Sequence, residues 1–201
     1  SAASDVYKRQ TQECSRMGIE VLKPNVQTSN KKFEVNIESK IEYGLGAIKG
    51  VADAFIDHLC SKREKTHFKD LWDFSKKIDI RLGGKKSLEA LSQSGAFDSL
   101  APTRSVAIEC TKDMLNDGRQ LNGNPNLKSG DLFSEMEQGF DPYEKYKNIN
   151  ELTLSEKLEL EKKSLGYYLS GHPVLAIENK IKKIRSKTIN KLNNDTKKAS
   201  L

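Results

Sequence analysis

Residues 43–52 read Tyr-Gly-Leu-Gly-Ala-Ile-Lys-Gly-Val-Ala, a glycine-rich run at which the sequence changes from a strand-like to a helical pattern. Its glycines, Gly44, Gly46 and Gly50, follow the spacing G-x-G-x-x-x-G, which is one residue longer than the dinucleotide-binding fingerprint. The run also lacks the Gly-Lys-Ser/Thr ending of a phosphate-binding P-loop. It therefore predicts a tight turn between two regions and not a nucleotide site.

The sequence on either side of this run predicts a mainly α fold with a small β portion at the N-terminus. Upstream, residues 19–22 and 33–37 alternate apolar and polar side chains as half-buried strands do, so residues 1–42 are expected to form loop and strand. Downstream, apolar residues recur at steps of three and four and predict two short helices. Their apolar stripes are Phe55, Ile56 and Leu59, then Phe68, Leu71, Phe74 and Ile78.

Two further helices are predicted before residue 116. Leu88 and Leu91 mark the first of them, which Gly95 ends because glycine readily adopts the left-handed conformation beyond a helix end. After a turn at residues 96–101, Pro102 can begin the next helix, since it lacks an N–H and its φ is preset. One face of that helix is expected to carry Val106, Cys110 and Met114.

Two turns between these helices are candidate nucleic-acid contacts. At the first, Gly50 lets the backbone approach a phosphate, free N–H groups at the next helix start face the anion, and Lys49 adds a cation. This is the logic of the helix-hairpin-helix motif, which holds a DNA phosphate without reading bases. The usual second glycine is Ala52 here. The candidate residues are Ile48, Lys49, Gly50, Val51 and Ala52. The alternative is a tight turn without a ligand.

The second candidate turn lies within residues 94–104. Phe97 and Leu100 are expected to anchor this hairpin in the core, while N–H groups at the next helix start, together with Arg104, face outward toward a second phosphate. The candidate residues are Phe97, Asp98, Ser99, Leu100, Ala101, Thr103 and Arg104. The alternative is an ordinary corner between two helices.

Composition and charge organise the rest of the chain. Residues 116–150 are rich in Asn, Gly, Pro and acidic residues and are expected to form a flexible linker. Thr153 and Glu156 can form a capping box that begins a helix within residues 151–173. Of 34 basic and 28 acidic residues, residues 1–173 hold 26 of each, so the net charge of +6 lies wholly in the tail at 174–201. The case for nucleic acid therefore rests on the two hairpins and not on overall charge.

The sequence indicates no catalytic residue and no metal site. Cys14, Cys60 and Cys110 are too widely spaced for a zinc motif or a disulfide framework, which favours a reducing, cytoplasmic setting. The three histidines have no second ligand at metal spacing. No apolar run approaches the roughly 20 residues of a membrane span, so no membrane partner is expected.

Four segments, in order and at matching spacing, resemble the bacterial DNA polymerase III alpha subunit, a C-family replicative DNA polymerase. They are residues 41–51, 68–74, 88–91 with 95–98, and 165–173, the last reading Leu-Gly-Tyr-Tyr-Leu-Ser-Gly-His-Pro. Residues 13–22 look like the end of that enzyme's fingers region. The resemblance covers about residues 11–198.

The resemblance implies a fragment of a polymerase that acts in DNA replication. It implies the end of the fingers at residues 11–42, a tandem helix-hairpin-helix module holding template-primer duplex at 43–115, and the approach to an OB domain after residue 173. Residues 1–10 resemble nothing in the family and are taken as a non-native remnant. The palm, whose aspartates hold catalytic Mg²⁺, and the domains that bind other replicase subunits would lie outside the chain. We therefore expect no cofactor in this fragment and no polymerase activity from it alone.

The family also implies a peptide within the linker, of the form Gln-x-Asp/Ser-Leu-Phe, that binds the sliding clamp. The matching residues are Ser129, Gly130, Asp131, Leu132 and Phe133, with serine in place of the usual glutamine. Leu132 and Phe133 would supply the apolar anchors for a partner's pocket, or alternatively fold back on their own domain.

Two other interpretations of the whole chain remain. One is a stand-alone helix-hairpin-helix module of a repair protein, against which residues 165–173 argue. The other is a structural spacer without DNA contact.

Overall fold

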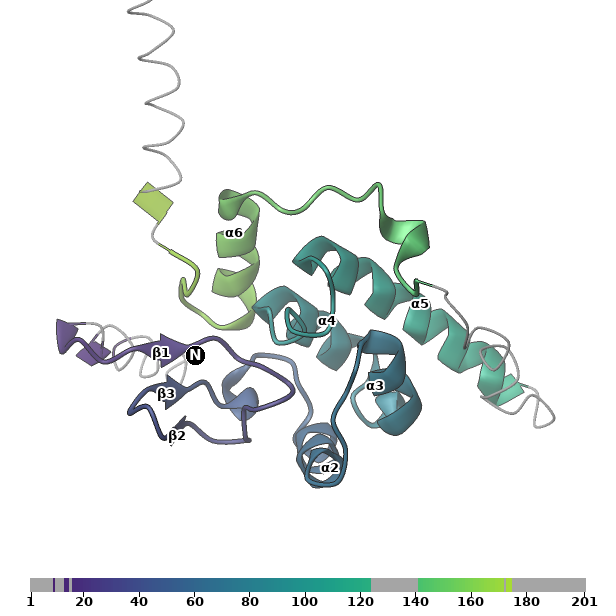
Figure 1. The fold of residues 1–201 in the computed structure, drawn as a ribbon, viewed down its shortest axis with the longest axis horizontal. Helices are drawn as coiled ribbons and strands as arrows, with labels where there is room; N and C mark the ends of the chain where they lie inside the picture. The colour runs from purple at the N-terminus through teal and green to yellow at the C-terminus, as the bar shows by residue number, and fades with distance from the viewer. Residues whose placement is uncertain (1–8, 10–12, 15, 124–140, 172, 175–201) are drawn as a thin grey trace, which may run out of the picture.

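The structure, a computed structural model, describes residues 9, 13–14, 16–123, 141–171 and 173–174 (Figure 1). Helices dominate these residues, and the short strands lie near the N-terminus, so the predicted fold class is confirmed. The α-helices are α2 (Asp53–Arg63), α3 (Leu71–Lys77), α4 (Gly84–Ser94), α5 (Arg104–Gly123) and α6 (Leu154–Ser164). The 3-10 helices are η1 (Leu45–Ala47), η2 (Ile80–Leu82) and η4 (Glu144–Tyr146).

The strands β1 (Val21–Leu22), β2 (Glu34–Val35) and β3 (Ile41–Glu42) form one small sheet in the order β1-β3-β2. The central strand β3 is parallel to β1 and antiparallel to β2. The first two strands lie inside the two segments predicted to be strands. The third was not predicted as a separate strand, because residues 38–42, Glu-Ser-Lys-Ile-Glu, show no run of alternating apolar and polar side chains.

The helices form where the apolar periodicity places them. Gly95 ends α4 with φ of 83°, and its N–H donates to the carbonyls of Leu91 and Ser92, as expected of a left-handed C-cap. The next helix, α5, begins at Arg104, two residues later than Pro102. The hydroxyl of Thr103 explains this start, because its Oγ1 accepts the N–H of Val106 at 3.2 Å in the manner of an N-cap.

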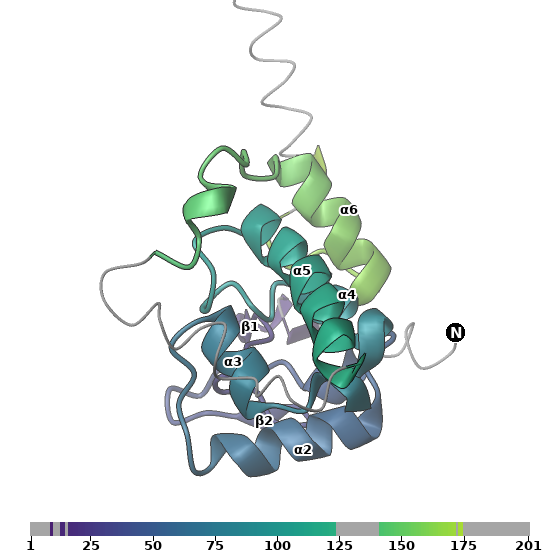
Figure 2. The same cartoon turned by 90° about the vertical axis from the view of Figure 1, so that its right-hand side faces the viewer.

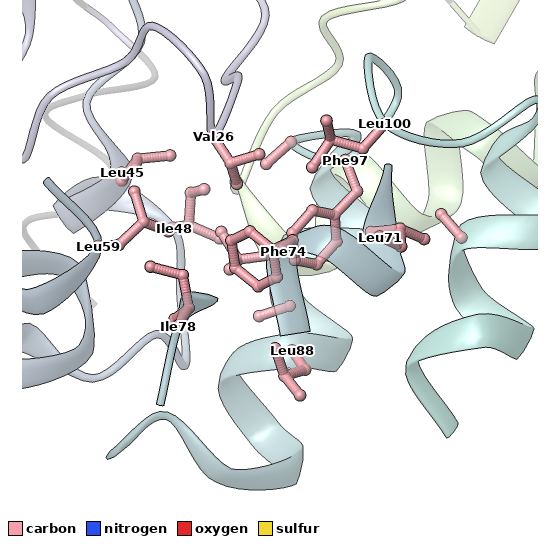
Figure 3. Packing of buried hydrophobic residues seen from close by; sticks show 14 of the residues in the cluster. Val26, Leu45, Ile48, Leu59, Leu71, Phe74, Ile78, Leu88, Phe97 and Leu100 are labelled. Atoms are coloured by element: carbon pink, nitrogen blue, oxygen red, sulfur yellow. The ribbon is translucent and has the colours of Figure 1, made fainter. Parts of the chain in front are cut away.

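The core lies between the helices and the loop that joins β1 to β2, which contributes Val26, and Phe74 is near its centre (Figure 3). The Phe74 ring meets Phe68 and Phe97 edge to face, each at a centroid separation of 5.1 Å. Helix α4 packs against both α5 and α6 (Figure 2). Every residue of the predicted apolar stripes on α2, α3, α4 and α5 is buried. These residues are Phe55, Ile56, Leu59, Phe68, Leu71, Phe74, Ile78, Leu88, Leu91, Val106, Cys110 and Met114.

The linker expected at residues 116–150 is wrong at both of its ends, and residues 124–140 between them lie outside the described residues. Helix α5 extends to Gly123, and residues 141–149 pack against the body of the protein. The hydroxyl of Tyr143 donates to the Leu100 carbonyl at 2.5 Å and accepts the Leu71 N–H at 3.1 Å. Tyr146 is buried, and its hydroxyl donates to Asp113. Two tyrosines with satisfied hydroxyls thus hold a segment whose polar composition indicated disorder.

Helix α6 begins as predicted. Thr153 accepts the Glu156 N–H, and the Glu156 carboxylate accepts the Thr153 N–H, which completes the capping box. Within the described part of the chain, no helix combines the length and the apolar character needed to cross a membrane.

Candidate nucleic-acid interface

The first hairpin, residues 48–52, joins η1 to α2. Ile48 is buried in the core, whereas the Lys49 side chain is exposed. Gly50 has φ of +96°, a conformation that a side chain disfavours. The hairpin therefore has the backbone geometry that the sequence predicted, with its apolar residue inward and its cation outward.

Two N–H groups of this hairpin were predicted to face an anion but are bonded to other helices instead. The Lys49 N–H donates to the Ser164 carbonyl of α6 at 2.8 Å. The Ala52 N–H donates to Ser87 Oγ of α4 at 3.0 Å, and that hydroxyl in turn donates to the Gly50 carbonyl. Helices from 35 and more residues away in the sequence therefore satisfy two of the donors that local reasoning left free for an anion, those of Lys49 and Ala52.

Exposed lysines lie near Gly50 instead. Lys49 precedes it in the chain, Lys86 of α4 approaches it, and Lys85 precedes Lys86, so we call Lys49, Lys85 and Lys86 the Gly50 cation cluster. The alkyl chain of Lys86 lies so close that a Cβ placed on Gly50 would be 3.2 Å from its Cε. Lys85 is its neighbour in the first turn of α4. Neither Lys85 nor Lys86 was among the predicted site residues. The signal that could have found them is the run Gly-Gly-Lys-Lys at residues 83–86, just before a predicted helix.

The first turn of α4 carries two lysines, and Lys85 Nζ forms an ion pair with Glu89 Oε1, one turn further along the same helix, at 3.7 Å. The N-cap of α4, Gly83, offers no side chain to the first N–H groups, and the first turn, all of it within the described residues, holds no acidic residue. Because the N-terminal end of a helix already carries partial positive charge, Lys85 and Lys86 add to an unfavourable accumulation there. A phosphate would relieve it, since exposed N–H groups and cations together form an anion site.

The second hairpin differs from its prediction at Arg104. Phe97 and Leu100 are buried as expected, and Asp98 and Ser99 are exposed. Arg104, however, is 2% exposed and does not face outward. Its guanidinium donates to the Asp98 carboxylate through Nε at 3.1 Å and Nη2 at 2.6 Å, and to the Glu161 carboxylate through Nη1 at 3.1 Å. The prediction that Arg104 faces outward and contacts DNA is therefore wrong.

The N-terminus of α5 is also occupied from within. The Glu151 carboxylate, 47 residues away in sequence, accepts the Arg104 N–H at 3.0 Å and the Ser105 hydroxyl at 3.2 Å. Burial alone would raise the pKa of Glu151, but these hydrogen bonds and the Leu152 N–H lower it overall and keep the group ionised. An internal carboxylate thus takes the place that was predicted for a second phosphate.

Glu161 is the most deeply buried acid of the described residues, with a side chain 0% exposed. Burial favours its neutral form, yet the hydrogen bonds from Ser170 and Leu169 and the Arg104 guanidinium outweigh burial and lower its pKa. It therefore remains an anion that matches the Arg104 cation. No local signal predicts this pair, because nothing in the neighbouring sequence distinguishes Glu161 from the other acids of α6.

The remaining predicted site residues lie outside the described residues. These are the residues of the clamp-binding peptide, 129–133. The basic tail at 174–201, which was predicted as a linker and not as a site, also lies outside the described residues except for Val174. Within the described ranges, no three His, Cys, Asp or Glu side chains gather in a way that could hold a metal ion.

Comparison with known proteins identifies the family. A family model described as the helix-hairpin-helix motif matches residues 18–107, a span that contains both hairpins. The DNA polymerase III subunit alpha of Pseudomonas fluorescens is 33% identical over 89% of this chain, and that of Pasteurella multocida is 36% identical over 81%. The chain belongs to the DNA polymerase III alpha subunit family.

The relatives of this family extend far beyond the chain. It spans 17% of the Pseudomonas fluorescens subunit and 14% of those from Pasteurella multocida and Borreliella burgdorferi, the last at 34% identity. The matches reach 94% of the chain, in Neisseria meningitidis, and so include residues well outside the helix-hairpin-helix segment. The resemblance to the DNA polymerase III alpha subunit that the motifs indicated is therefore confirmed.

Proposed function

We propose that this chain is the duplex-holding segment of a replicative DNA polymerase that works in the cytoplasm. Its family and its helix-hairpin-helix motif support the DNA-binding role. The observation that carries the proposal is the Gly50 cation cluster, which places Lys49 and Lys86 beside the Gly50 turn, with Lys85 next to Lys86 at a helix start that has no side-chain cap. Such a site binds phosphate oxygens and reads no base edge, so binding is independent of sequence.

Only the first hairpin takes part in this proposal as a phosphate site. At the second hairpin the helix start is filled by Glu151 and the arginine is neutralised by Asp98 and Glu161. The second hairpin then serves the first by completing the core through Phe97 and Leu100. The number of phosphates engaged is accordingly small.

The test is the salt dependence of duplex binding. We expect the double variant Lys85→Gln, Lys86→Gln to bind an arbitrary duplex several-fold more weakly. The slope of log K against log salt should become shallower by about 0.9 for each phosphate that the variant no longer neutralises. The matched control is Lys62→Gln, Lys65→Gln, which removes two exposed lysines at the far end of α2, about 15 Å along its axis. If the control weakens binding as much as the first variant, binding has no preferred face and the proposal fails.

We further propose that residues 129–133 tether the polymerase to the sliding clamp. The support is the resemblance of this peptide to the family's clamp-binding form, with Leu132 and Phe133 as its apolar anchors. Phe133→Ala should abolish retention on immobilised sliding clamp. Leu127→Ala, a comparable truncation earlier in the same segment, should leave retention unchanged. Equal retention of the Phe133 variant and the unmutated chain would refute the tether.

Catalysis, and contacts with other replicase subunits, we assign to parts of the longer protein outside this chain. The described residues do not fit the Mg²⁺ pair of a polymerase palm, because no group of three candidate ligands gathers among them. We therefore derive no metal-dependent step from these residues. The 201-residue chain, supplied with primed template, nucleotides and Mg²⁺, should extend no primer.

A further inference from the structure

Helix α6 contacts both hairpins through residues less than one turn apart. The carbonyl of Ser164 accepts the Lys49 N–H of the first hairpin at 2.8 Å. The carboxylate of Glu161 accepts Arg104 Nη1 of the second hairpin at 3.1 Å. We propose that Glu161 is a positioning residue for DNA binding, which anchors α6 to the second hairpin and thereby holds the first hairpin in its binding geometry.

The Glu161 carboxylate joins three parts of the chain at one buried point. Its Oε2 accepts the N–H groups of Leu169 and Ser170, both at 2.8 Å, and its Oε1 accepts the Ser170 hydroxyl as well as Arg104. The side chains of Glu161 and Arg104 are 0% and 1% exposed. Water therefore cannot replace any partner that is removed, and the anchor depends on the full set.

The path from this anchor to the first hairpin is short and rigid. Ser164 lies in the last turn of α6, where carbonyls have no partner inside the helix. Its bond to Lys49 therefore satisfies a helix-end carbonyl and a hairpin N–H at the same time. The neighbouring Leu165 is buried, and the Tyr167 ring lies 5.9 Å from that of Tyr43, just before the hairpin. A shift of the last turn of α6 must therefore move the Lys49 end of the hairpin.

The other side of the hairpin depends on a different helix. The Ala52 N–H is held by Ser87 of α4 and does not involve α6. The expected effect is therefore local: loss of the Glu161 anchor frees Lys49 and leaves Ala52 protected. A general loss of stability would instead affect both amides alike.

The decisive experiment is amide hydrogen exchange of the 201-residue chain, resolved by NMR at Lys49 and Ala52. Glu161→Gln preserves size but removes the charge opposite Arg104 and sets an NH₂ group among N–H donors. Lys49 should exchange about tenfold faster, the factor that removal of a hydrogen bond of ordinary net strength implies, while Ala52 keeps its rate. An unchanged Lys49 rate, or an equal rise at both amides, would overturn the proposal.

Two further variants keep the test sharp if Glu161→Gln does not fold. Ser170→Ala removes one hydroxyl donor and leaves the Glu161–Arg104 pair in place, so it should give a smaller rise that is again confined to Lys49. Tyr146→Phe removes a hydroxyl bond to Asp113 that has no connection to α6, and it should leave the ratio of the Lys49 and Ala52 rates unchanged. A selective rise at Lys49 in the Tyr146 variant would contradict the assigned path.

The DNA-binding arm of the inference rests on the proposed function, whereas the exchange measurement does not. Glu161→Gln should weaken duplex binding several-fold with an unchanged salt slope, because the lysines that meet phosphates remain. A selective rise at Lys49 with unchanged duplex affinity would support the positioning contact and refute the DNA-binding role of the first hairpin. The two failures are therefore distinguishable.

Discussion

Arg104 and Glu161, 57 residues apart in the sequence, form an ion pair whose two side chains are almost fully buried. Removing two charges from water is costly, and the pair persists because Asp98, Leu169 and Ser170 satisfy the remaining donors and acceptors. An arginine that local sequence assigns to DNA is thus part of the folded framework.

Arg104→Ala should destabilise the protein by about 3–5 kcal/mol, because it leaves the buried Glu161 carboxylate without its counter-charge. Urea unfolding followed by circular dichroism measures the change. The matched control Arg81→Ala removes an exposed arginine paired with Asp79 and should cost less than about 1 kcal/mol. Comparable losses would show that the buried pair has no special role. It follows that Arg104 variants cannot test phosphate contact.

Acid should destabilise the protein through the same carboxylate. The pKa of Glu161 lies below its ordinary value of 4.5, since its hydrogen bonds and Arg104 outweigh burial. A pKa depressed by folding gives stability that is complete above the unfolded value and is lost as pH falls through the folded one. The free energy of unfolding should therefore stay nearly constant between about pH 7 and 5 and decrease below about pH 4.5.

Glu161→Gln provides the comparison for that pH series. The variant should be less stable at neutral pH and should lose less stability on acidification, because one of the carboxylates that link folding to proton release is gone. Part of the pH dependence of stability should remain in the variant, because the pKa values of Glu151, Asp113 and Asp73 are also lowered. Parallel curves for the variant and the unmutated chain would contradict the assignment.

Gly50→Ala should destabilise the first hairpin by about 1–2 kcal/mol, the cost of a left-handed conformation for an L-residue. Its new Cβ would also press on Lys86. Gly84→Ala is a control at φ of +61° with open space around it, so it measures backbone strain alone. We expect the Gly50 variant to lose more stability than the control and to bind duplex more weakly. Equal effects on both properties would show that contact with Lys86 is unimportant.

Tyr143→Phe should cost about 1–3 kcal/mol, because it leaves the Leu71 N–H and the Leu100 carbonyl without their shared partner. Thermal unfolding measures the effect. Tyr168→Phe, which alters a tyrosine 40% exposed, is the control and should have little effect. If the Tyr143 variant is as stable as the control, the hydrogen bonds of the Tyr143 hydroxyl contribute nothing to the stability of the protein.

Local sequence signals predicted the helices well. The stripe from Phe68 to Ile78, the Gly95 C-cap and the Thr153–Glu156 capping box each depend on residues within a few positions of one another, and each is present. Residues 141–149 escaped prediction for the opposite reason. Tyr143 and Tyr146 order that segment through Leu71, Leu100 and Asp113, none of which lies near them in the sequence.

In the candidate site, too, local features could be predicted from the sequence and long-range contacts could not. Motif spacing along the chain was sufficient to indicate the family, the helical architecture, the Gly50 turn and the exposure of Lys49. The partners of its polar groups came from tertiary packing: Ser164 and Ser87 hold the first hairpin, and Glu151 fills the second. Periodicity, caps and turns are set by near neighbours, whereas a buried donor takes whichever acceptor the packed helices bring to it. For that reason the turn was visible in the sequence, whereas the position of Lys86 beside Gly50 and the Glu161 anchor were visible only in the fold.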